Sequence, residues 1–367
     1  MTISPLKFLL TIAVAAGGGS LFWGLGTPLP WLLGSLAATG CLGLISGTHK
    51  CPSSAVHAGQ ITIGLALGLY FTPTMLAILG SMFGWILAAA LMTCLMSMMG
   101  AFVFQRLTGL DACSSFFASA IGAATDMSIQ ASKLGGRGDL VALSHSVRVT
   151  LVVSVMPVAA AILVGSAAGR APMVEIPGLP LQTTVVLAAA ALGAALVGAK
   201  IRLPNAWVMA PLLTALALAQ FIPEHRLRYE WVAVGQVLLG WNLGQRFTRS
   251  IFKESPKLIA ASALMTVGFG ILGLGIATFV HYGTGVPWVS SMIATAPGGV
   301  AEMAITAKVL HLDPPTVTAF HAMRLVLMVV GAGLMLKLCQ RWGWLKYKSH
   351  GRSAVASNAA LGLGKGA

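Results

Sequence analysis

The sequence predicts an all-α polytopic membrane protein with two homologous repeats, and three observations support this. First, 57% of its 367 residues are hydrophobic and only 9% are charged, whereas soluble domains carry about 25% charged residues. Second, the apolar runs at 75–104, 183–199 and 258–280 are each long enough to cross a hydrocarbon core, which requires roughly 20 helical residues. Third, residues 31–148 recur as 207–324 at a constant offset of 176 (207 minus 31).

The duplication divides the chain into two membrane units. We expect a first repeat at 1–165, a linker at 166–182, a second repeat at 183–340 and a basic cytoplasmic tail at 341–367. Internal repeats in an apolar chain are typical of secondary transporters, whose substrate site lies between the repeats near the middle of the bilayer. First-copy residues that recur identically 176 positions later include Trp31, Gly59, Gln60, Gly64, Gly68, Gly109, Ser114, Ser115, Gly122, Met127, His145 and Arg148.

Each repeat contains six apolar segments, and helices are expected because lipid offers no partner for free backbone groups. The first is retained as a helix rather than cleaved as a signal peptide, since hydrophobicity resumes at 21–25. The second begins at a proline and an interfacial tryptophan. The third carries glycines at spacings of four and five, which favour close helix packing. In the first repeat the segments are 6–26, 30–46, 54–71, 75–104, 112–132 and 140–164.

The basic residues predict the topology. The formal net charge is +14, but the Lys and Arg residues lie in short loops and the tail, which disfavours a nucleic-acid-binding domain. If the fifth segment of each repeat enters and returns on one side, most of the 23 basic residues face the cytoplasm. We therefore predict about ten crossing helices, two re-entrant or broken segments, inverted repeats and cytoplasmic termini.

The fifth segments have the composition of interrupted helices. The stretch "TAPGGVAEM" at 295–303 contains Pro297, Gly298 and Gly299, and "SAIGAATDM" at 119–127 is its weaker counterpart. Proline removes a backbone donor and glycine leaves the helical conformation readily. Open backbone at membrane depth is tolerated only where it is buried in protein or lines a watery cavity. A kinked but ordinary crossing helix is the alternative.

Four charged residues lie in apolar surroundings: Asp126 and Glu302 in the fifth segments, and Arg148 and Arg324 in the sixth. Each charge costs on the order of 2.5 to 3.5 kcal/mol near the bilayer centre. In a functional interpretation, arginine and opened helix ends receive an anionic group while a carboxylate binds the proton or cation that drives transport. Alternatively, the carboxylates and arginines form fixed ion pairs that lock the repeats together.

His145 and His321 each precede an arginine by three residues and share its helix face, so they are candidates for proton relay. Hydroxyl and amide groups complete the candidate site, although serine and threonine between membrane helices more often serve packing. The amides need partners in an apolar helix and are candidates to face a cavity. These additional candidates are Ser291, Thr295, Gln236 and Asn242, with Ser114, Ser115 and Ser290 as further hydroxyls.

The five cysteines show no metal-ligand spacing, so we expect free thiols, no metal and no cofactor. The expected partners are a small-molecule or ion substrate and the lipid bilayer, without direct nucleic-acid binding. A homodimer is plausible for a membrane fold of this size.

The chain resembles the AbrB family of duplicated bacterial inner-membrane proteins. The resemblance rests on "PWLLGSLAA" at 30–38, "TAPGGVAEM" and "FHAMRLVLM" at 320–328. It implies an inner-membrane location and a link to regulation of gene expression. No soluble DNA-binding module fits beside so many membrane segments, so any such effect is expected to be indirect. The first copy departs from the pattern at Ile121 and Asp126, which puts symmetric function of the copies in doubt.

Secondary transport of a small polar or anionic metabolite, coupled to protons or a cation, is the leading hypothesis, and the protein is not expected to be an enzyme. The chain offers no nucleotide-binding loop for direct use of ATP. The runner-up is a membrane sensor that binds a ligand in the same cavity. A metal-dependent oxygenase, suggested by the label ammonia monooxygenase that some family members carry, is the least favoured, because arginines beside each histidine disfavour a bound cation.

Overall fold

A computed structural model describes residues 5–46, 50–165, 178–222, 225–247 and 255–345. In these ranges the secondary structure is helical, apart from one isolated bridge between Gly178 and Arg226. The expected linker at 166–182 and basic tail at 341–367 lie mostly outside the described residues.

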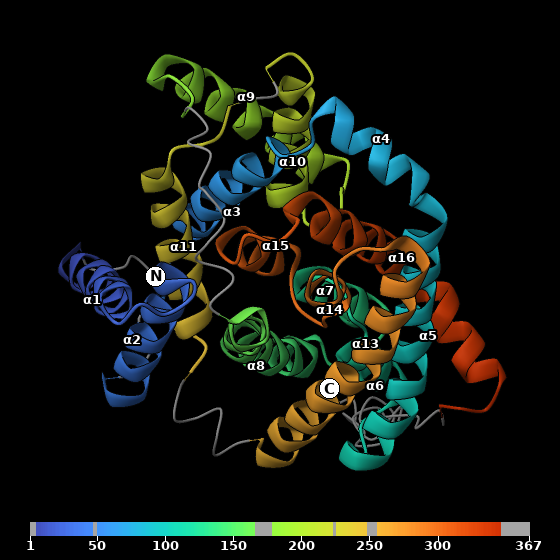
Figure 1. Ribbon diagram of the computed structural model, residues 1–367. Helices are drawn as coiled ribbons and strands as arrows, with labels where there is room; N and C mark the ends of the chain where they lie inside the picture. The colour runs from blue at the N-terminus through green and yellow to red at the C-terminus, as the bar shows by residue number, and fades with distance from the viewer. Residues whose placement is uncertain (1–4, 47–49, 166–177, 223–224, 248–254, 346–367) are drawn as a thin grey trace, which may run out of the picture.

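Most helices in the first half of the chain have a counterpart about 176 residues later, and the helices are labelled in Figure 1. Six pairs begin 176 residues apart, as Pro5 and Leu181 do for α1 and α9. The fourth segment differs from the expected 75–104, because α4 (Pro73–Ser81) and α5 (Phe83–Thr108) are separate helices. The remaining pairs are α1 (Pro5–Gly24) and α9 (Leu181–Lys200), α2 (Pro30–Ser46) and α10 (Ala206–Ala219), α3 (Ser53–Gly68) and α11 (Tyr229–Gly244), α6 (Ala112–Ser119) and α14 (Trp288–Thr295), α7 (Ala124–Lys133) and α15 (Val300–Val309), and α8 (Gly138–Val164) and α16 (Pro314–Arg341), with α13 (Pro256–Thr284) paired to α5.

Six helices pack side by side in the order α1, α2, α11, α3, α10, α9, and we call them the row (Figure 1). Glycines allow their close approach. A Cβ added at Gly64 of α3 would lie 2.5 Å from the Val208 oxygen of α10, and one at Gly240 of α11 would lie 2.5 Å from the Leu32 oxygen of α2. The glycines of the third segments therefore serve packing, as expected from their spacing.

The remaining long helices, α5, α8, α13 and α16, pack around the short helices α6, α7, α14 and α15, and we call this group the bundle. Helix α5 contacts α6, α13 and α16, whereas α8 contacts α6, α7 and α13. The bundle therefore encloses both interrupted segments.

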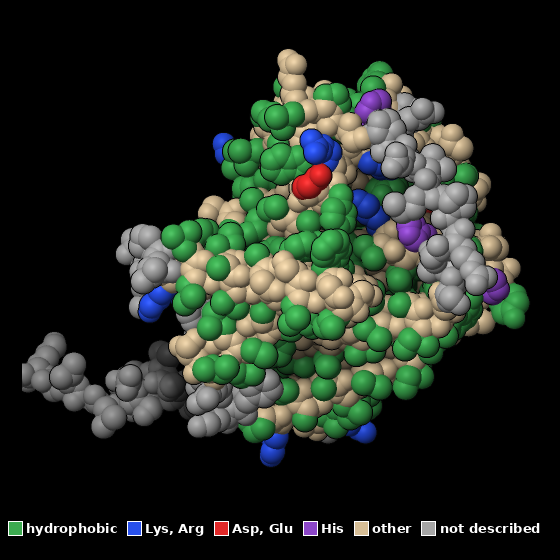
Figure 2. Space-filling model, turned by 60° about the vertical axis from the view of Figure 1, so that its left-hand side comes forward, with side chains coloured by type: hydrophobic (Ala, Val, Ile, Leu, Met, Phe, Trp, Pro, Cys, Tyr) green, Lys and Arg blue, Asp and Glu red, His purple; other side chains and the backbone are tan. Residues whose placement is uncertain are grey.

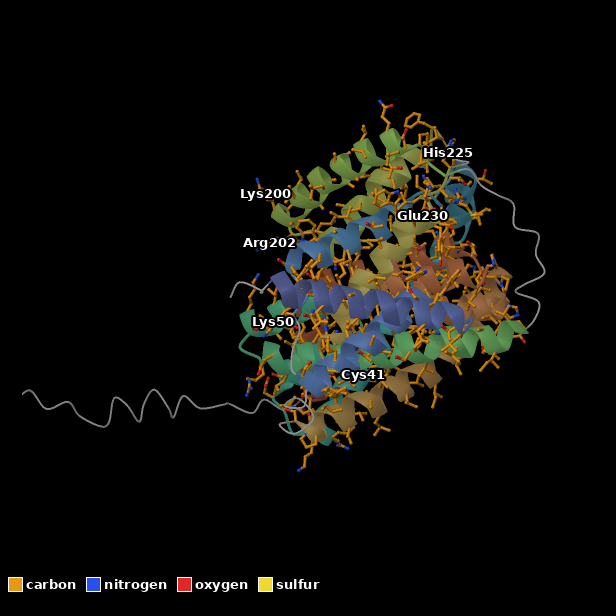
Figure 3. The ribbon with its side chains drawn as sticks, turned by 90° about the vertical axis from the view of Figure 1, so that its left-hand side faces the viewer. Cys41, Lys50, Lys200, Arg202, His225 and Glu230 are labelled. Atoms are coloured by element: carbon orange, nitrogen blue, oxygen red, sulfur yellow. The ribbon has the colours of Figure 1, made fainter. Side chains whose placement is uncertain are left out.

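The helices have the length and composition of a membrane protein. Six of the described helices are long and apolar enough to cross a bilayer, while α3 and α4 form a pair bent by 83°. Hydrophobic side chains cover most of the face in Figure 2. Lys50, Lys200 and Arg202 lie at one end of the helices, and His225 and Glu230 lie toward the other (Figure 3). This distribution keeps charges away from the middle of the apolar surface.

Backbone conformation follows the same offset as the helix starts. Residues with positive φ occur between helices at positions that differ by 176. Three of these four pairs contain at least one non-glycine residue, so the presence of glycine alone does not explain the match. The pairs are Gly26 with Arg202, Leu29 with Asn205, Gly109 with Gly285, and Gly135 with His311.

Candidate functional site

Two interrupted segments form the centre of the candidate site. Helix α6 ends at Ser119 and α7 begins at Ala124; in the same way α14 ends at Thr295 and α15 begins at Val300. The non-helical residues between them, 120–123 and 296–299, include the predicted Pro297, Gly298 and Gly299. The interruptions lie where the proline and glycines predicted them.

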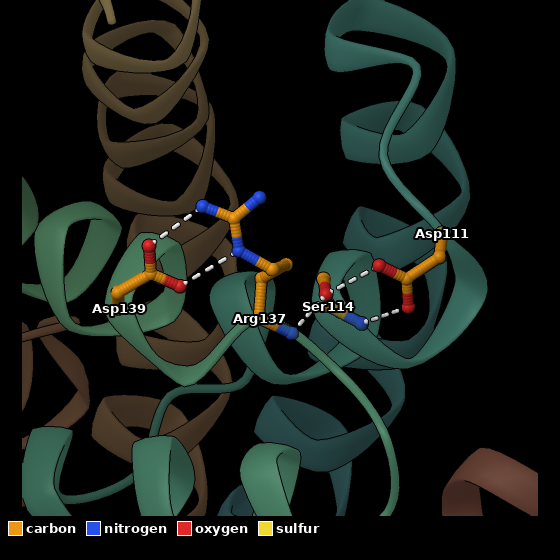
Figure 4. A network of polar contacts seen from close by, with 4 residues as sticks. All are labelled: Asp111, Ser114, Arg137 and Asp139. Atoms are coloured by element: carbon orange, nitrogen blue, oxygen red, sulfur yellow. Dashed lines mark hydrogen bonds and ion pairs between the residues drawn. The ribbon is translucent and has the colours of Figure 1, made fainter. Parts of the chain in front are cut away.

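Helices α6 and α7 form a hairpin whose two ends lie together (Figure 4). The backbone N–H of Arg137, just after α7, donates to the Ser114 hydroxyl at the start of α6 at 2.7 Å. Asp111 caps α6 by accepting from the Ser114 N–H at 2.8 Å. The side chain of Arg137 pairs with Asp139 at 2.8 Å. The chain therefore enters and leaves this hairpin at the same end.

Arg148 and Arg324 bind the backbone at the interruptions. The two terminal nitrogens of Arg148 donate to Ser119 O at 3.3 Å and Ala120 O at 2.9 Å. The two terminal nitrogens of Arg324 donate to the backbone oxygens of Ala296 and Gly298, each at 2.6 Å. A helix C-terminus exposes unpaired carbonyls and carries partial negative charge. Each guanidinium therefore supplies donors to backbone carbonyls at an interruption.

His145 and His321 belong to the same caps. His145 Nε2 lies 2.9 Å from Phe117 O, and His321 Nε2 lies 2.9 Å from Ile293 O. Since a carbonyl only accepts, Nε2 carries the proton and Nδ1 has a free lone pair. Arg148 donates to that lone pair at 2.7 Å and Arg324 does so at 2.9 Å. Both rings are fully buried, and the nitrogens that relay or metal ligation would require are already bonded.

The two carboxylates have different surroundings. Asp126 Oδ2 accepts from the backbone N–H of Asn205 at 3.1 Å, which connects α7 to the start of α10 in the row. The Glu302 carboxylate lies over the N-terminus of its own helix, where it would collide with a Cβ on Gly299. Within the described ranges, neither forms the ion pair with Arg148 or Arg324 that the alternative interpretation required.

Each interruption packs against the long helix of the other half. A Cβ on Gly122 would lie 3.1 Å from Met328 Cγ of α16, and a Cβ on Gly298 would lie 3.0 Å from Val152 Cγ1 of α8. The hydroxyls of Ser119 and Thr295 tie the half-helices to α5 and α13, because each donates at 3.1 Å to a backbone oxygen there. The interruptions therefore lie between the two halves of the molecule.

The other predicted polar residues are spread more widely. Ser291 donates weakly to Val286 O at 3.4 Å, while Thr295 donates within its own helix as well as to Gly273 O of α13. Gln236 and Asn242 lie on α11 of the row, where Asn242 Oδ1 accepts from Gln245 at 2.8 Å. Gln236 is buried, and its Oε1 has no hydrogen-bond partner.

A polar pocket of about 590 Å³ lies beside α7. Arg246, which follows α11, reaches it and donates to the Ser146 hydroxyl of α8 at 2.7 Å. From the sequence, Arg246 contributed only to the predicted positive charge on the cytoplasmic side. Its position directly after the glycine-rich helix α11 was the signal that could have marked it as a site residue. The pocket is lined by Ala124, Thr125, Ser128, Ile129, Asp139, Leu140, Ala142, Leu143, Ser146, Arg246 and Ser255.

The corresponding surface of α15 is closed. Val300, Ala301 and Ala304 are buried, and α15 packs against α3, whereas α7 and α11 lack comparable packing among the described residues. Near this closed side, the Tyr70 ring contacts Arg226 at 4.4 Å and Lys308 at 5.8 Å.

The comparisons with known proteins cover most of the chain. The sequence profile described as "Transition state regulatory protein AbrB" matches residues 31–340. The "Uncharacterized protein YhjN" of Bacillus subtilis (strain 168) is 26% identical over 348 residues, covering 88% of this chain and 91% of the relative. The "Putative regulator AbrB" of Escherichia coli (strain K12) is 26% identical over 310 residues, covering 81% of this chain and 86% of the relative. In the described residues, no three His, Cys, Asp or Glu side chains lie close enough to bind a metal ion.

Proposed function

This chain belongs to the AbrB family, and we propose that it is a secondary transporter of a small polar or anionic metabolite, coupled to protons or a cation. The observation that carries this proposal is the meeting of two interrupted hairpins between the halves of the molecule. Transporters built from repeats place substrate and coupling ion at such interruptions, where half-helix ends offer partial charges.

An inverted duplication with ten crossing helices and two re-entrant hairpins is part of this proposal. The paired helix starts and the paired positive-φ residues support the duplication. The bond between Arg137 and Ser114 supports a hairpin that enters and leaves on one side of the membrane. One re-entrant segment per repeat leaves an odd number of crossings, so the second repeat is inverted. We place the protein in the bacterial inner membrane with both termini in the cytoplasm.

The charged residues divide into structural and coupling roles in this proposal. Arg148 and Arg324 stabilise the interruptions by binding backbone carbonyls. Glu302 is our candidate for the coupling residue, since its carboxylate forms no ion pair within the described residues. An ionised carboxylate at membrane depth is costly unless it is paired or solvated. A proton or small cation bound at Glu302 would offset that cost.

The difference between the two sides supports alternating access. The pocket opens beside α7, while the equivalent surface of α15 is packed against α3. Because the halves share one architecture, each side has the same two arrangements available. Transport then consists of exchanging the open and closed sides around the central interruptions.

A membrane sensor is the second candidate, because the Escherichia coli relative carries the name of a regulator. A sensor would bind its ligand in the same pocket without moving it across the membrane. Saturable binding without flux would favour this candidate.

Reconstitution in liposomes tests the transport proposal. We would measure uptake of labelled amino acids, carboxylates and ammonium-like solutes under imposed pH and sodium gradients. Glu302→Gln is expected to reduce gradient-driven uptake by at least about tenfold, equivalent to about 1.4 kcal/mol. Asp126→Asn retains an oxygen for the Asn205 N–H and is expected to stay within about twofold, since it keeps that hydrogen bond. The exposed acid Glu230 provides a control, Glu230→Gln.

Three outcomes would contradict parts of this proposal. Equal loss in Glu302→Gln and Asp126→Asn would remove the special role of Glu302. Full gradient-driven uptake in Glu302→Gln would exclude it as the coupling residue. Absence of uptake for every solute, with saturable binding retained, would replace the transporter with the sensor.

A further inference from the structure

We infer that the pocket beside α7 binds the carboxylate group of a small organic anion, with Arg246 and the N-terminus of α7 as its ligands. The inference rests on the proposed function and deepens it by naming the substrate class. It follows from a difference between two equivalent helix ends.

The N-terminus of α15 already carries a carboxylate. The carboxylate of Glu302, the third residue of α15, lies against Gly299, the N-cap residue of that helix. The first N–H groups of a helix have no intrahelical partner and attract anions. Glu302 therefore supplies from within the chain the anion that this helix end favours.

The N-terminus of α7 lacks the equivalent group. Its N-cap residue is Ala123, which has no side chain acceptor and makes no capping hydrogen bond. Asp126, the equivalent of Glu302, has a shorter side chain and accepts instead from Asn205 of the row. The helix end that α15 covers with its own carboxylate is thus left without one at α7.

A pocket and a cation lie where the missing carboxylate would be. Ala124 and Thr125, the first two residues of α7, line the pocket together with Arg246. One guanidinium nitrogen of Arg246 donates to Ser146, and the fork of an arginine has donors for a carboxylate as well. In the part of the chain that the structure describes, no carboxylate lies within ion-pair distance of Arg246, although the Glu302 carboxylate of α15 is near enough to interact with its charge.

The rest of the lining favours a small anion over a cation. Thr125 and Ser255 provide hydroxyl donors, whereas the hydroxyls of Ser128 and Ser146 already donate to the backbone oxygens of Ala124 and Ala142. The acidic residue in the lining, Asp139, is exposed and already paired with Arg137 at 2.8 Å. A volume of about 590 Å³ is in the range of small-molecule sites.

The charge preference of the pocket is measurable before any substrate is known. We would introduce Thr125→Cys after removing the exposed Cys41 and the partly exposed Cys51, and compare its reaction rates with an anionic and a cationic methanethiosulfonate. The anionic-to-cationic rate ratio is expected to exceed that of Ser132→Cys, on the exposed surface of α7, by about tenfold. Arg246→Gln should remove most of this excess. The matched control Lys133→Gln, on the same helix, should leave it within about twofold.

Ligand protection then identifies the chemistry. Acetate, succinate and citrate are the anionic probes, ethylammonium the cationic probe and glycerol the neutral one, each tested for slowing the reaction of Thr125→Cys with an uncharged maleimide. At least one carboxylate should protect, and Arg246→Gln should raise its half-protecting concentration by about tenfold or more, since charge-assisted bonds are strong. Arg246→Lys should restore part of the affinity.

Two results overturn the inference: failure of all three carboxylates to protect, or protection that is unchanged in Arg246→Gln. The proposed function fails separately. Protection by a carboxylate without uptake into liposomes would leave the anion site in place and exclude transport. Gradient-driven uptake of a neutral or cationic solute, without carboxylate protection, would retain transport and remove the anion site.

Discussion

The hairpins α6–α7 and α14–α15 resemble each other at the C-terminal ends of α6 and α14. They differ at the N-terminal ends of α7 and α15. At both C-terminal ends an arginine and a histidine bind backbone carbonyls, and the two histidine distances are both 2.9 Å. At the N-terminal ends, Glu302 covers α15, whereas Asp126 leaves α7 and binds Asn205. The shared feature stabilises an interruption that each half requires, and the differing feature decides what each side can bind.

The same comparison separates an open side from a closed side. Thr125 and Ser128 of α7 face a pocket, while their equivalents Ala301 and Ala304 of α15 are buried. Polar residues therefore occur where the described state is open, and small apolar residues occur where it is closed. The two hairpins share a fold but differ in the side chains that they expose.

The largest expected effect tests the arginines that bind the backbone carbonyls at both interruptions. Replacing Arg324 with alanine leaves two buried carbonyls without donors, and an unsatisfied buried group costs about 1 to 3 kcal/mol. We therefore expect a stability loss of about 2 to 6 kcal/mol, similar for Arg148→Ala, measured by thermal unfolding in detergent. The conservative variant Arg324→Lys should recover only part, since one ammonium does not reproduce the planar fork. A large loss in one variant and none in the other would show that the two caps are not equivalent.

Much of this architecture follows from the sequence alone. The helical class and the positions of the interruptions depend on local chemistry: apolar length, Pro297, and the glycines beside it. The helix boundary at Met82 was missed because the neighbouring Gly80, Ser81 and Gly84 were included in one apolar run at 75–104.

The candidate site was harder to predict because the partners are distant in the chain. Arg148 and Arg324 were expected to meet a substrate or a carboxylate, yet they donate to carbonyls 26 to 29 positions away. A sequence shows that a buried charge needs a partner, but it does not show that backbone supplies it. Arg246 was overlooked for the same reason, since its neighbour Ser146 lies 100 positions away.

The second prediction tests the open and closed sides directly. In a background without Cys41 and Cys51, a thiol at Ser128→Cys should react with a polar maleimide at least about tenfold faster than one at the equivalent Ala304→Cys, which corresponds to a difference of about 1.4 kcal/mol in accessibility. The ratio should fall or reverse in conditions that favour the opposite arrangement, such as saturating substrate. Equal reactivity of the two thiols in every condition would contradict the assignment of one open and one closed side.

The smallest expected effect concerns the N-cap residue, which is Gly299 for α15 and Ala123 for α7. Gly299 has φ of −80° and ψ of 155°, which any residue can adopt, so Gly299→Ala tests only the added Cβ. That Cβ would displace the Glu302 carboxylate from the helix end. Loss of a favourable cap costs about 1 kcal/mol, so we expect a small fall in unfolding temperature and a loss of gradient-driven uptake smaller than that of Glu302→Gln.

The reciprocal change, Ala123→Gly, is the matched control for that prediction. No carboxylate covers α7 in the described state, and glycine is slightly favoured over alanine at an N-cap, so stability and uptake should remain within experimental error or rise slightly. If both exchanges reduced uptake equally, the two helix ends would bind anions in the same way. Glu302 would then not be the internal counterpart of a substrate carboxylate, and the difference between the hairpins would be one of packing alone.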